Sequence, residues 1–228
     1  MPEIIDLSIP IRDGEGRLGL ENRLATPFTF ENCGWQGTTF TMFAHMATHI
    51  DAPVHFIKGG KAIHEAPLER LIGPAGLVEL DDHGRDAAIT GDTLEDRARH
   101  IRKGDIVILR TSWSDKCWGT PAFWKEGPYL VPNAADWLVE RGVRAVVYDF
   151  AEEYVVRQEG FRGEDCLVHH RILGEEIYNI EYVHCLSKIR RPRLAIIAFP
   201  LKLVGSDGSP ARVVAIEGHE LPSDFAVR

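Results

Sequence analysis

The sequence lacks the short motifs that mark several large classes of protein. Its four cysteines form no C-x-x-C pair, no G-x-x-x-x-G-K-[ST] run is present, and no serine stands in a G-x-S-x-G context. A zinc ribbon, a disulfide scaffold, a P-loop nucleotide site and a serine acyl enzyme are therefore all disfavoured. Any catalytic chemistry has to come from other side chains.

Long apolar runs and basic clusters are scarce as well. No apolar stretch reaches the roughly 18 residues that a membrane span needs, and the opening residues, MPEIIDLSIPIRDGEG, do not resemble a secretion signal. The formal charge is −8, and no Lys/Arg cluster is interleaved with aromatic residues. We therefore expect a cytoplasmic protein that binds neither nucleic acid nor a membrane.

The 228 residues are 44% hydrophobic, which is enough to bury a substantial core. No repeat or linker divides the chain, so a single domain over residues 1–228 is expected. Strands and helices are mixed without a regular βαβ rhythm, which predicts an α+β fold or a partly closed sheet and not a Rossmann fold. The sequence predicts strands at 4–11, 37–50, 73–81, 105–113, 144–150 and, as a hairpin, 193–217; helices at 90–105, 131–143 and 164–174; and a long loop at 12–35.

Residues 45–56, HMATHIDAPVHF, concentrate potential metal ligands. His45, His49, Asp51 and His55 all have odd numbers, so an extended chain would place them on one face. A straight strand at ~3.3 Å per residue would still separate His45 from His49 by roughly 13 Å, so the segment has to bend before both can reach one ion. Imidazole and carboxylate are ligands that suit zinc, manganese and related divalent ions. Further ligands have to come from elsewhere. Composition leaves open many carboxylates and these histidines: His64, His83, His100, His169, His170, His184 and His219.

The same stretch resembles the H-x-G-T-H-x-D-x-P-x-H motif of the cyclase-like metal-dependent hydrolases, which include bacterial kynurenine formamidases and isatin hydrolases. Other segments resemble the family in the same order along the chain, from IIDLSIPI near the start to FPLKLVGSDGSPARVVAI near the end. A second family motif, H-x-x-L-L-x-x-x-I-x-x-x-E, is matched by HHRILGEEIYNIE when it starts at His169 and ends at Glu181. The resemblance implies an α+β fold of the swivelling β/β/α type, with a mostly β core and peripheral helices.

The resemblance also implies a set of roles. One divalent ion would be held by His49, Asp51, His169 and Glu181, and a second by His45 together with the bridging Asp51 and Glu181. His55 would carry protons during attack of metal-activated water on a C–N amide bond. Zn²⁺ is the first candidate ion, as one ion or two, with Mn²⁺ as the alternative and Co²⁺ compatible. The implied partners are a small amide or lactam substrate and further copies of the chain, in a homodimer or homotetramer.

Three departures from the family pattern concern substrate binding more than the ligands. Ala47 replaces a glycine, YDFAEEYVV (148–156) replaces a small polar segment, and 12–35 lacks a compact Trp-Pro-Gly-Asp-like element. The chemistry implied by the resemblance therefore transfers better than the substrate does. The leading substrate class that the resemblance implies is an N-formyl arylamine, with a cyclic amide, imide or lactone as the rival. A metal-binding protein without activity is a third reading, which the presence of His55 disfavours. Thr48 could orient the ligands, and four aromatic residues could line the pocket: Phe28, Phe30, Trp35 and Trp113.

Overall fold

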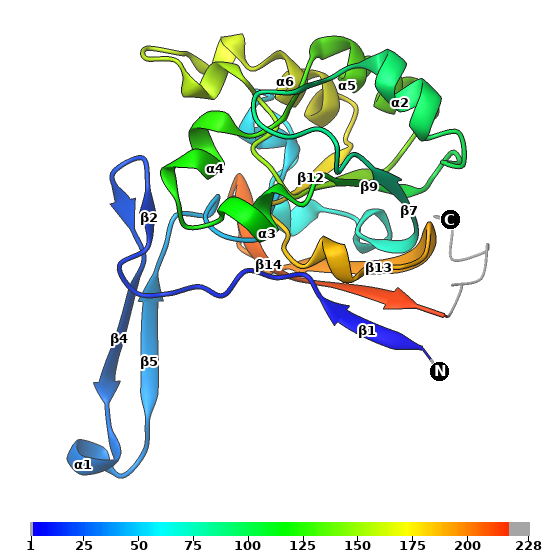
Figure 1. Ribbon diagram of the computed structural model, residues 1–228. Coiled ribbons are helices and arrows are strands. Elements are labelled where there is room, and N and C mark those ends of the chain that lie inside the picture. The colour runs from blue at the N-terminus through cyan, green and yellow to red at the C-terminus, as the bar shows by residue number, and fades with distance from the viewer. Residues whose placement is uncertain (1, 219–228) are drawn as a thin grey trace.

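The computed structural model describes residues 2–218, and one eight-stranded mixed sheet forms its centre (Figure 1). β6 pairs with β14 as well as with β12, so the sheet curls into a barrel-like ring, and β1 lies beyond β14 on the outside of that ring. The neighbouring strands β7, β9, β11 and β12 run parallel, and the other pairs are antiparallel. In spatial order the strands are β1 (Glu3–Asp6), β14 (Gly208–Glu217), β13 (Arg193–Pro200), β7 (Ile72–Glu79), β9 (Ile106–Arg110), β11 (Ala145–Tyr148), β12 (Tyr178–Glu181) and β6 (His49–Asp51).

The apolar runs of the central strands follow from burial on both faces. In β9, Ile106 and Ile108 belong to the core inside the ring, while Val107 and Leu109 belong to the core between the sheet and the helices. Successive side chains of a strand point to opposite faces, so a strand covered on both sides has no polar positions. The unbroken run IVIL is therefore what a central strand of this sheet requires.

Helices cover the outer face of the parallel strands (Figure 1). α5 (Pro132–Arg141) packs between α2 (Gly91–Arg97) and α6 (Leu167–Gly174). Pro132 fits the first turn of α5, and Gly142 ends it in the left-handed conformation, with φ of 68°. Two short helices, α3 (Trp113–Cys117) and α4 (Pro121–Glu126), follow β9. None of the helices formed by residues 2–218 has the length and apolar character needed to cross a membrane.

The predicted α+β class, with a mostly β core and peripheral helices, is confirmed. The prediction of a long loop at 12–35 is wrong, because these residues begin a projecting arm (Figure 1). The arm contains a hairpin of β4 (Arg23–Phe28) and β5 (Gly37–Thr41) with α1 (Phe30–Cys33) at its tip. The expected strand at 37–50 divides into β5 and β6, and β12 was not predicted. Two short pairs complete the structure, β2 (Gly16–Arg17) with β3 (Leu20–Glu21), and β8 (Ala88–Ile89) with β10 (Tyr129–Leu130).

Residues 14–19 spell a G-x-G-x-x-G run, GEGRLG. That pattern binds dinucleotides when it joins a strand to the start of a helix. Here it forms the small β2–β3 hairpin, so it carries no nucleotide site. The expectation that the fold is not of the Rossmann type stands on this geometry as well as on the sheet order.

Candidate metal centre

The short strand β6 presents two of the expected ligands on one face. His49 and Asp51 are two residues apart and share a face, while Ile50 between them belongs to the core. The antiparallel pairing of β6 with β12 places Glu181 directly opposite His49. A histidine, an aspartate and a glutamate are thus brought together by strand register, and all three are almost fully buried.

The bend that the spacing required lies just before β6. Ala47 adopts φ of 54°, a left-handed conformation that glycine accepts most readily, which explains the family preference for glycine at this position. The Ala47 methyl group packs in the core beside the helices, and Ala47 is not among the residues that line the pocket. Gly208 provides the room for His45, because a Cβ atom there would lie 2.7 Å from His45 Cε1.

The ligand atoms form two triads that share Asp51. His45, His49 and Asp51 form one, and Asp51, His169 and Glu181 form the other. His49 Nε2 lies 3.2 Å from Asp51 Oδ1 and 3.5 Å from Glu181 Oε2, while His169 Nε2 lies 3.4 Å from Glu181 Oε1. The structure thus brings all five expected ligands together but groups His49 with His45, whereas the resemblance had grouped it with His169.

Each of the three histidines has one nitrogen committed to an acceptor outside the triads. His49 Nδ1 lies 2.9 Å from the Ala47 carbonyl oxygen, and His169 Nδ1 lies 3.2 Å from Glu153 Oε1. His45 Nε2 lies 2.9 Å from Asp207 Oδ2. Since a carbonyl or carboxylate oxygen only accepts, each of these nitrogens carries the hydrogen and donates it.

When a ring is neutral, its other nitrogen carries a lone pair. In each of the three histidines that lone pair points toward a carboxylate oxygen. His45 Nδ1 is 2.6 Å from Asp51 Oδ1, and His49 Nε2 faces the same carboxylate. Asp51 Oδ2, Glu181 Oε1 and His49 Nε2 are buried without a hydrogen-bond partner among the described residues. Acceptors that converge in this way need positive charge between them, as protons or as a metal ion. Divalent cations fit this donor set, and the outer acceptors are of the kind that orient metal-binding histidines.

In the absence of ions, the cluster has to hold protons. Burial alone would lower the pKa of His45, but the Asp51 and Asp207 carboxylates outweigh it and raise that pKa to about 10. His169 behaves likewise, and its neighbours, above all Glu152, hold its pKa well above the ordinary value. Burial and the nearby Glu181 raise the pKa of Glu152 to about 8.

His55 belongs to neither of the two triads, although it forms a further group of potential ligand atoms with His45 and Asp207. It ends a 3₁₀ turn at Pro53–His55, and its ring stacks on His45 with centroids 3.8 Å apart. His55 Nδ1 lies 3.1 Å from Asp207 Oδ2, the oxygen that also binds His45 Nε2. Hydrogen bonds from the two rings hold the pKa of Asp207 well below its usual range, so this carboxylate is ionised. Asp207 fixes Nδ1 of His55 as a donor and leaves Nε2 for proton exchange.

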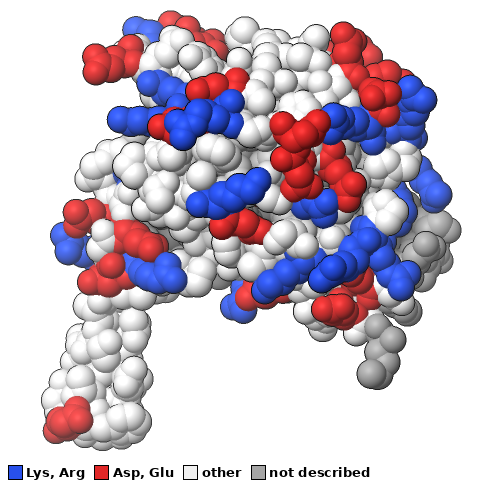
Figure 2. All heavy atoms as spheres, in the orientation of Figure 1, with Lys and Arg blue, Asp and Glu red and all other residues white. Residues whose placement is uncertain are grey.

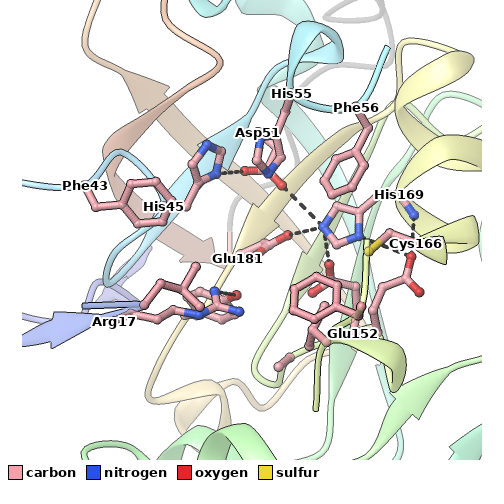
Figure 3. A pocket seen from close by; sticks show the side chains of 16 residues that line it. Arg17, Phe43, His45, Asp51, His55, Phe56, Glu152, Cys166, His169 and Glu181 are labelled. Carbon is pink, nitrogen blue, oxygen red and sulfur yellow. Dashed lines mark hydrogen bonds and ion pairs between the residues drawn. The ribbon is translucent and has the colours of Figure 1, made fainter. Parts of the chain in front are cut away.

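The cluster lies at one side of a pocket with about 640 Å³ of empty volume, part of which is open to solvent (Figure 3). Its apolar walls include Phe43, Phe56 and Phe161, and Arg17 enters from the β2–β3 hairpin. The Arg17 guanidinium lies 4.2 Å from the centre of the Trp124 ring and donates a hydrogen bond of 2.6 Å to Tyr182 Oη. The pocket therefore combines aromatic surface and one cationic side chain with the acidic cluster.

The family follows from comparison with known proteins. Residues 5–152, more than half of the chain, match the model of the Cyclase family. The chain belongs to the Cyclase family. Among curated proteins, this member of the family is 29% identical to a kynurenine formamidase from Bacillus cereus over 225 residues, which covers 93% of this chain and 96% of that protein. The resemblance seen in the sequence is confirmed at the level of the family.

Solved structures of similar fold cover nearly the whole Cyclase-family chain. A predicted metal-dependent hydrolase from Bacillus stearothermophilus is 28% identical, with a TM-score of 0.76 and coverage of 95% of this chain and 99% of that one. Isatin hydrolase A from Labrenzia aggregata has a TM-score of 0.81 at 22% identity, with coverage of 94% and 93%. The second comparison establishes the fold alone.

Thr48, which precedes His49, joins two other segments next to the cluster, because its Oγ1 accepts a hydrogen bond from Ile9 N and donates one to the carbonyl oxygen of Tyr182, the residue after Glu181. Other residues proposed from the sequence lie away from the cluster. The four aromatic residues proposed for the pocket do not line it: three are exposed on the arm and Trp113 is in the core. His219 lies outside the described residues. The histidines that contact other parts of the described structure are His64, His83, His100, His170 and His184.

Sequence reasoning missed the carboxylates around the ligands. Glu152 and Glu153 belong to the segment at 148–156 that departs from the family pattern, and both contact His169. Asp207 lies in the run SDGSP, which its composition marks only as a turn. The departure from the family pattern at 148–156 was the one indication that Glu152 and Glu153 could matter. The sequence gives no such indication for Asp207.

We expect the metal affinity of this Cyclase-family protein to rise with pH. His45 and His169 hold protons at neutral pH in the ion-free chain, since both pKa values are raised, and an incoming ion has to displace them. Displacement of one proton per ion weakens binding about tenfold for each pH unit of acidification. Chelator competition with Zn²⁺ at pH 6, 7 and 8 measures the slope, and an affinity independent of pH would contradict this assignment of the ligands.

Proposed function

We propose that this chain is a metal-dependent hydrolase that cleaves the C–N bond of an amide, foremost an N-formyl arylamine. The observation that supports it most is the convergence of three imidazole nitrogens and two buried carboxylates beside a separate histidine. The similarity to kynurenine formamidase over 96% of that protein's length supports the same reaction class. A structural metal site needs no proton carrier beside it, so His55 disfavours the reading without activity.

His45, His49, Asp51, His169 and Glu181 would hold two divalent ions, with Zn²⁺ as the first candidate and Mn²⁺ as the second. When bound, such ions polarise the amide carbonyl and the attacking water. His55 then moves the protons: Nε2 accepts one from the water and delivers it to the leaving nitrogen. Asp207 keeps Nδ1–H of His55 as a donor, so that each transfer takes place at Nε2.

The pocket walls support an aromatic substrate. Phe43, Phe56 and Phe161 offer surface on which an aryl ring can pack. Phe56 itself stacks on His169 with centroids 4.3 Å apart, which places that surface next to the ligands. Arg17 provides a positive charge for an anionic group elsewhere on the substrate.

A substrate panel separates this function from its rival. Metal-loaded protein should hydrolyse N-formylkynurenine faster than isatin or a simple lactone if the proposal is right. The fold shared with isatin hydrolase supports opening of a cyclic amide as the second candidate, and faster turnover of isatin would select it. Binding of metal ions without turnover of any acyl compound in the panel would contradict both.

We further propose that the chain forms a homodimer through its arm, with a homotetramer as the larger alternative. Both strands of the β4–β5 hairpin are almost entirely exposed, and an isolated two-stranded hairpin is marginal in water. Residues 22–43 contain only two charged residues, and Figure 2 shows the arm as a nearly uncharged projection. Its exposed apolar side chains are Leu24, Phe28, Phe30, Trp35 and Phe40. A second copy is the partner that can cover such a surface in every molecule.

Charge placed on the arm should therefore yield monomers. We expect the double variant Trp35→Asp and Phe40→Asp to halve the molar mass measured by light scattering after size-exclusion chromatography. Leu68→Asp, at an apolar residue that is 52% exposed on the body, is the matched control and should leave the mass unchanged. A wild-type monomer, or a double variant that keeps the wild-type mass, would contradict the role of the arm.

A further inference from the structure

Glu152 lies closer to the ligand nitrogen of His169 than either of the carboxylates expected to share an ion with it. Glu152 Oε1 is 2.6 Å from His169 Nε2, whereas Glu181 Oε1 is 3.4 Å and Asp51 Oδ2 is 3.8 Å away. Figure 3 shows these carboxylates around one edge of the ring. Glu152 is 2% exposed, so water does not solvate its charge.

The distances around His169 Nε2 are close to those between donor atoms that share one ion. Two nitrogen or oxygen ligands at about 2.1 Å from a metal lie about 3.0–3.4 Å from each other in ordinary coordination geometries. Glu181 Oε1 lies at that separation from His169 Nε2, and Asp51 Oδ2 lies slightly beyond it. Glu152 Oε1 is closer, at direct hydrogen-bond distance, and an outward movement of about 0.4 Å would bring it to the separation of two ligands of one ion. Asp51 Oδ2 and Glu181 Oε1 are also buried without a hydrogen-bond partner among the described residues. A cation between these two oxygens and His169 Nε2 would satisfy both.

Glu153, the next residue, has a different task. Its Oε1 accepts hydrogen bonds from the His169 backbone N, at 2.9 Å, and from the protonated Nδ1 of the same ring. It therefore anchors the first turn of α6 and fixes the ring orientation. Glu153 therefore contacts Nδ1 of His169 and Glu152 contacts Nε2. Only Nε2 faces the side on which an ion would bind, so only Glu152 lies on that side.

We propose that Glu152 is an additional protein ligand of the ion held by Asp51, His169 and Glu181. Once His169 Nε2 gives its lone pair to the ion, the proton between Nε2 and Glu152 is lost, and a buried carboxylate needs another cation. The ion meets that need. The inference rests on the proposed metal centre but not on the identity of the amide substrate.

The two ion positions then differ in chemistry. The position beside His45 and His49 offers two imidazoles, which suit Zn²⁺. The position beside Glu152 offers three carboxylates and one imidazole, which is an oxygen-rich set that suits Mn²⁺ better. This chain should therefore hold Mn²⁺ more strongly at the His169 position than a family member with a small polar residue in place of Glu152.

Calorimetric titration of the ion-free protein with Mn²⁺ and with Zn²⁺, without substrate, tests the assignment. Glu152→Gln keeps the shape but removes the charge, and it should weaken Mn²⁺ binding at one position by at least about tenfold. The loss for Zn²⁺ should be smaller. Glu153→Gln is the matched comparison, since its amide oxygen can still accept both hydrogen bonds, and it should weaken Mn²⁺ binding less than Glu152→Gln does. Glu164→Gln, at an exposed carboxylate that contacts Arg162, is the control and should leave the affinity unchanged.

If Glu152→Gln and Glu153→Gln weaken Mn²⁺ binding equally, the loss comes from the change in local charge and the proposal is overturned. Mn²⁺ affinity at the wild-type level in Glu152→Gln would overturn it as well. If Glu152→Gln does not fold, Glu152→Asp serves instead, because it keeps the charge and shortens the reach. Electron paramagnetic resonance of bound Mn²⁺ should then show a changed ligand environment, and an unchanged spectrum would overturn the inference. Failure of the wild type to bind any ion would instead refute the proposed function.

Discussion

Asp51→Asn is expected to abolish turnover and to remove at least one ion from each chain. Asp51 is shared by both triads and is 1% exposed, so no water or neighbouring side chain can take over its two oxygens. Loss of metal assistance is worth several kcal/mol of transition-state stabilisation, which at 1.36 kcal/mol per tenfold corresponds to about 10³-fold or more in rate. Elemental analysis after dialysis and the rate with an N-formyl arylamine give the two readouts.

The substitution keeps the shape of the side chain but removes the charge that stabilises protonated His45 in the ion-free chain. The ion-free variant should therefore unfold at a lower temperature than the ion-free wild type, and circular dichroism at the assay temperature checks that it is folded when its metal content is measured. Asp82→Asn, at an exposed carboxylate paired with Arg97, is the control and should keep both ions and activity. Full metal content in Asp51→Asn would refute the shared-ligand role.

His55→Ala is expected to lower kcat by about 10²–10⁴-fold, the usual contribution of a positioned acid–base group, while the metal content stays at the wild-type level. His55 lies outside both triads, and its Nδ1 contacts Asp207 instead of the ligands. Steady-state kinetics combined with elemental analysis measures the two quantities on the same sample.

His170→Ala provides the comparison for His55→Ala. His170 follows a proposed ligand directly, yet its Nε2 lies 3.1 Å from the Gly163 carbonyl oxygen and outside the cluster. Its loss should change neither rate nor metal content by much. If His55→Ala loses as much metal as Asp51→Asn, then His55 is a ligand, and the proton carrier has to be sought elsewhere.

The local part of the site could be predicted from the residues themselves. The equal parity of His45, His49 and Asp51, together with the need for a bend, matches a turn at Ala47 followed by a short strand. The distant part could not be derived in this way. Glu181 reaches His49 through the pairing of β12 with β6, and such register between strands about 130 residues apart leaves no trace in spacing or composition. The resemblance supplied that information.

The arm and the extra carboxylates show two other limits. Strand prediction relies on alternation between a buried and an exposed face, and residues 23–28 have both faces exposed in a single chain, so Gly, Asn and Pro nearby indicated a loop. The sequence singles out Glu152 and Glu153 only as part of the departing segment 148–156, and residue type alone does not show that they are buried. Their burial follows from the bridge of Glu153 to Leu130 and from the helix α6 packed above them, which only the tertiary structure reveals.

The central claim is that this cluster holds ions that make amide hydrolysis possible, and one titration tests it most directly. Ion-free protein is titrated with Zn²⁺ while hydrolysis of N-formylkynurenine is followed. We predict no turnover without the ion and a rate that rises until two ions per chain are bound. Full activity of the ion-free protein, or saturation with ions without any turnover, would contradict this account.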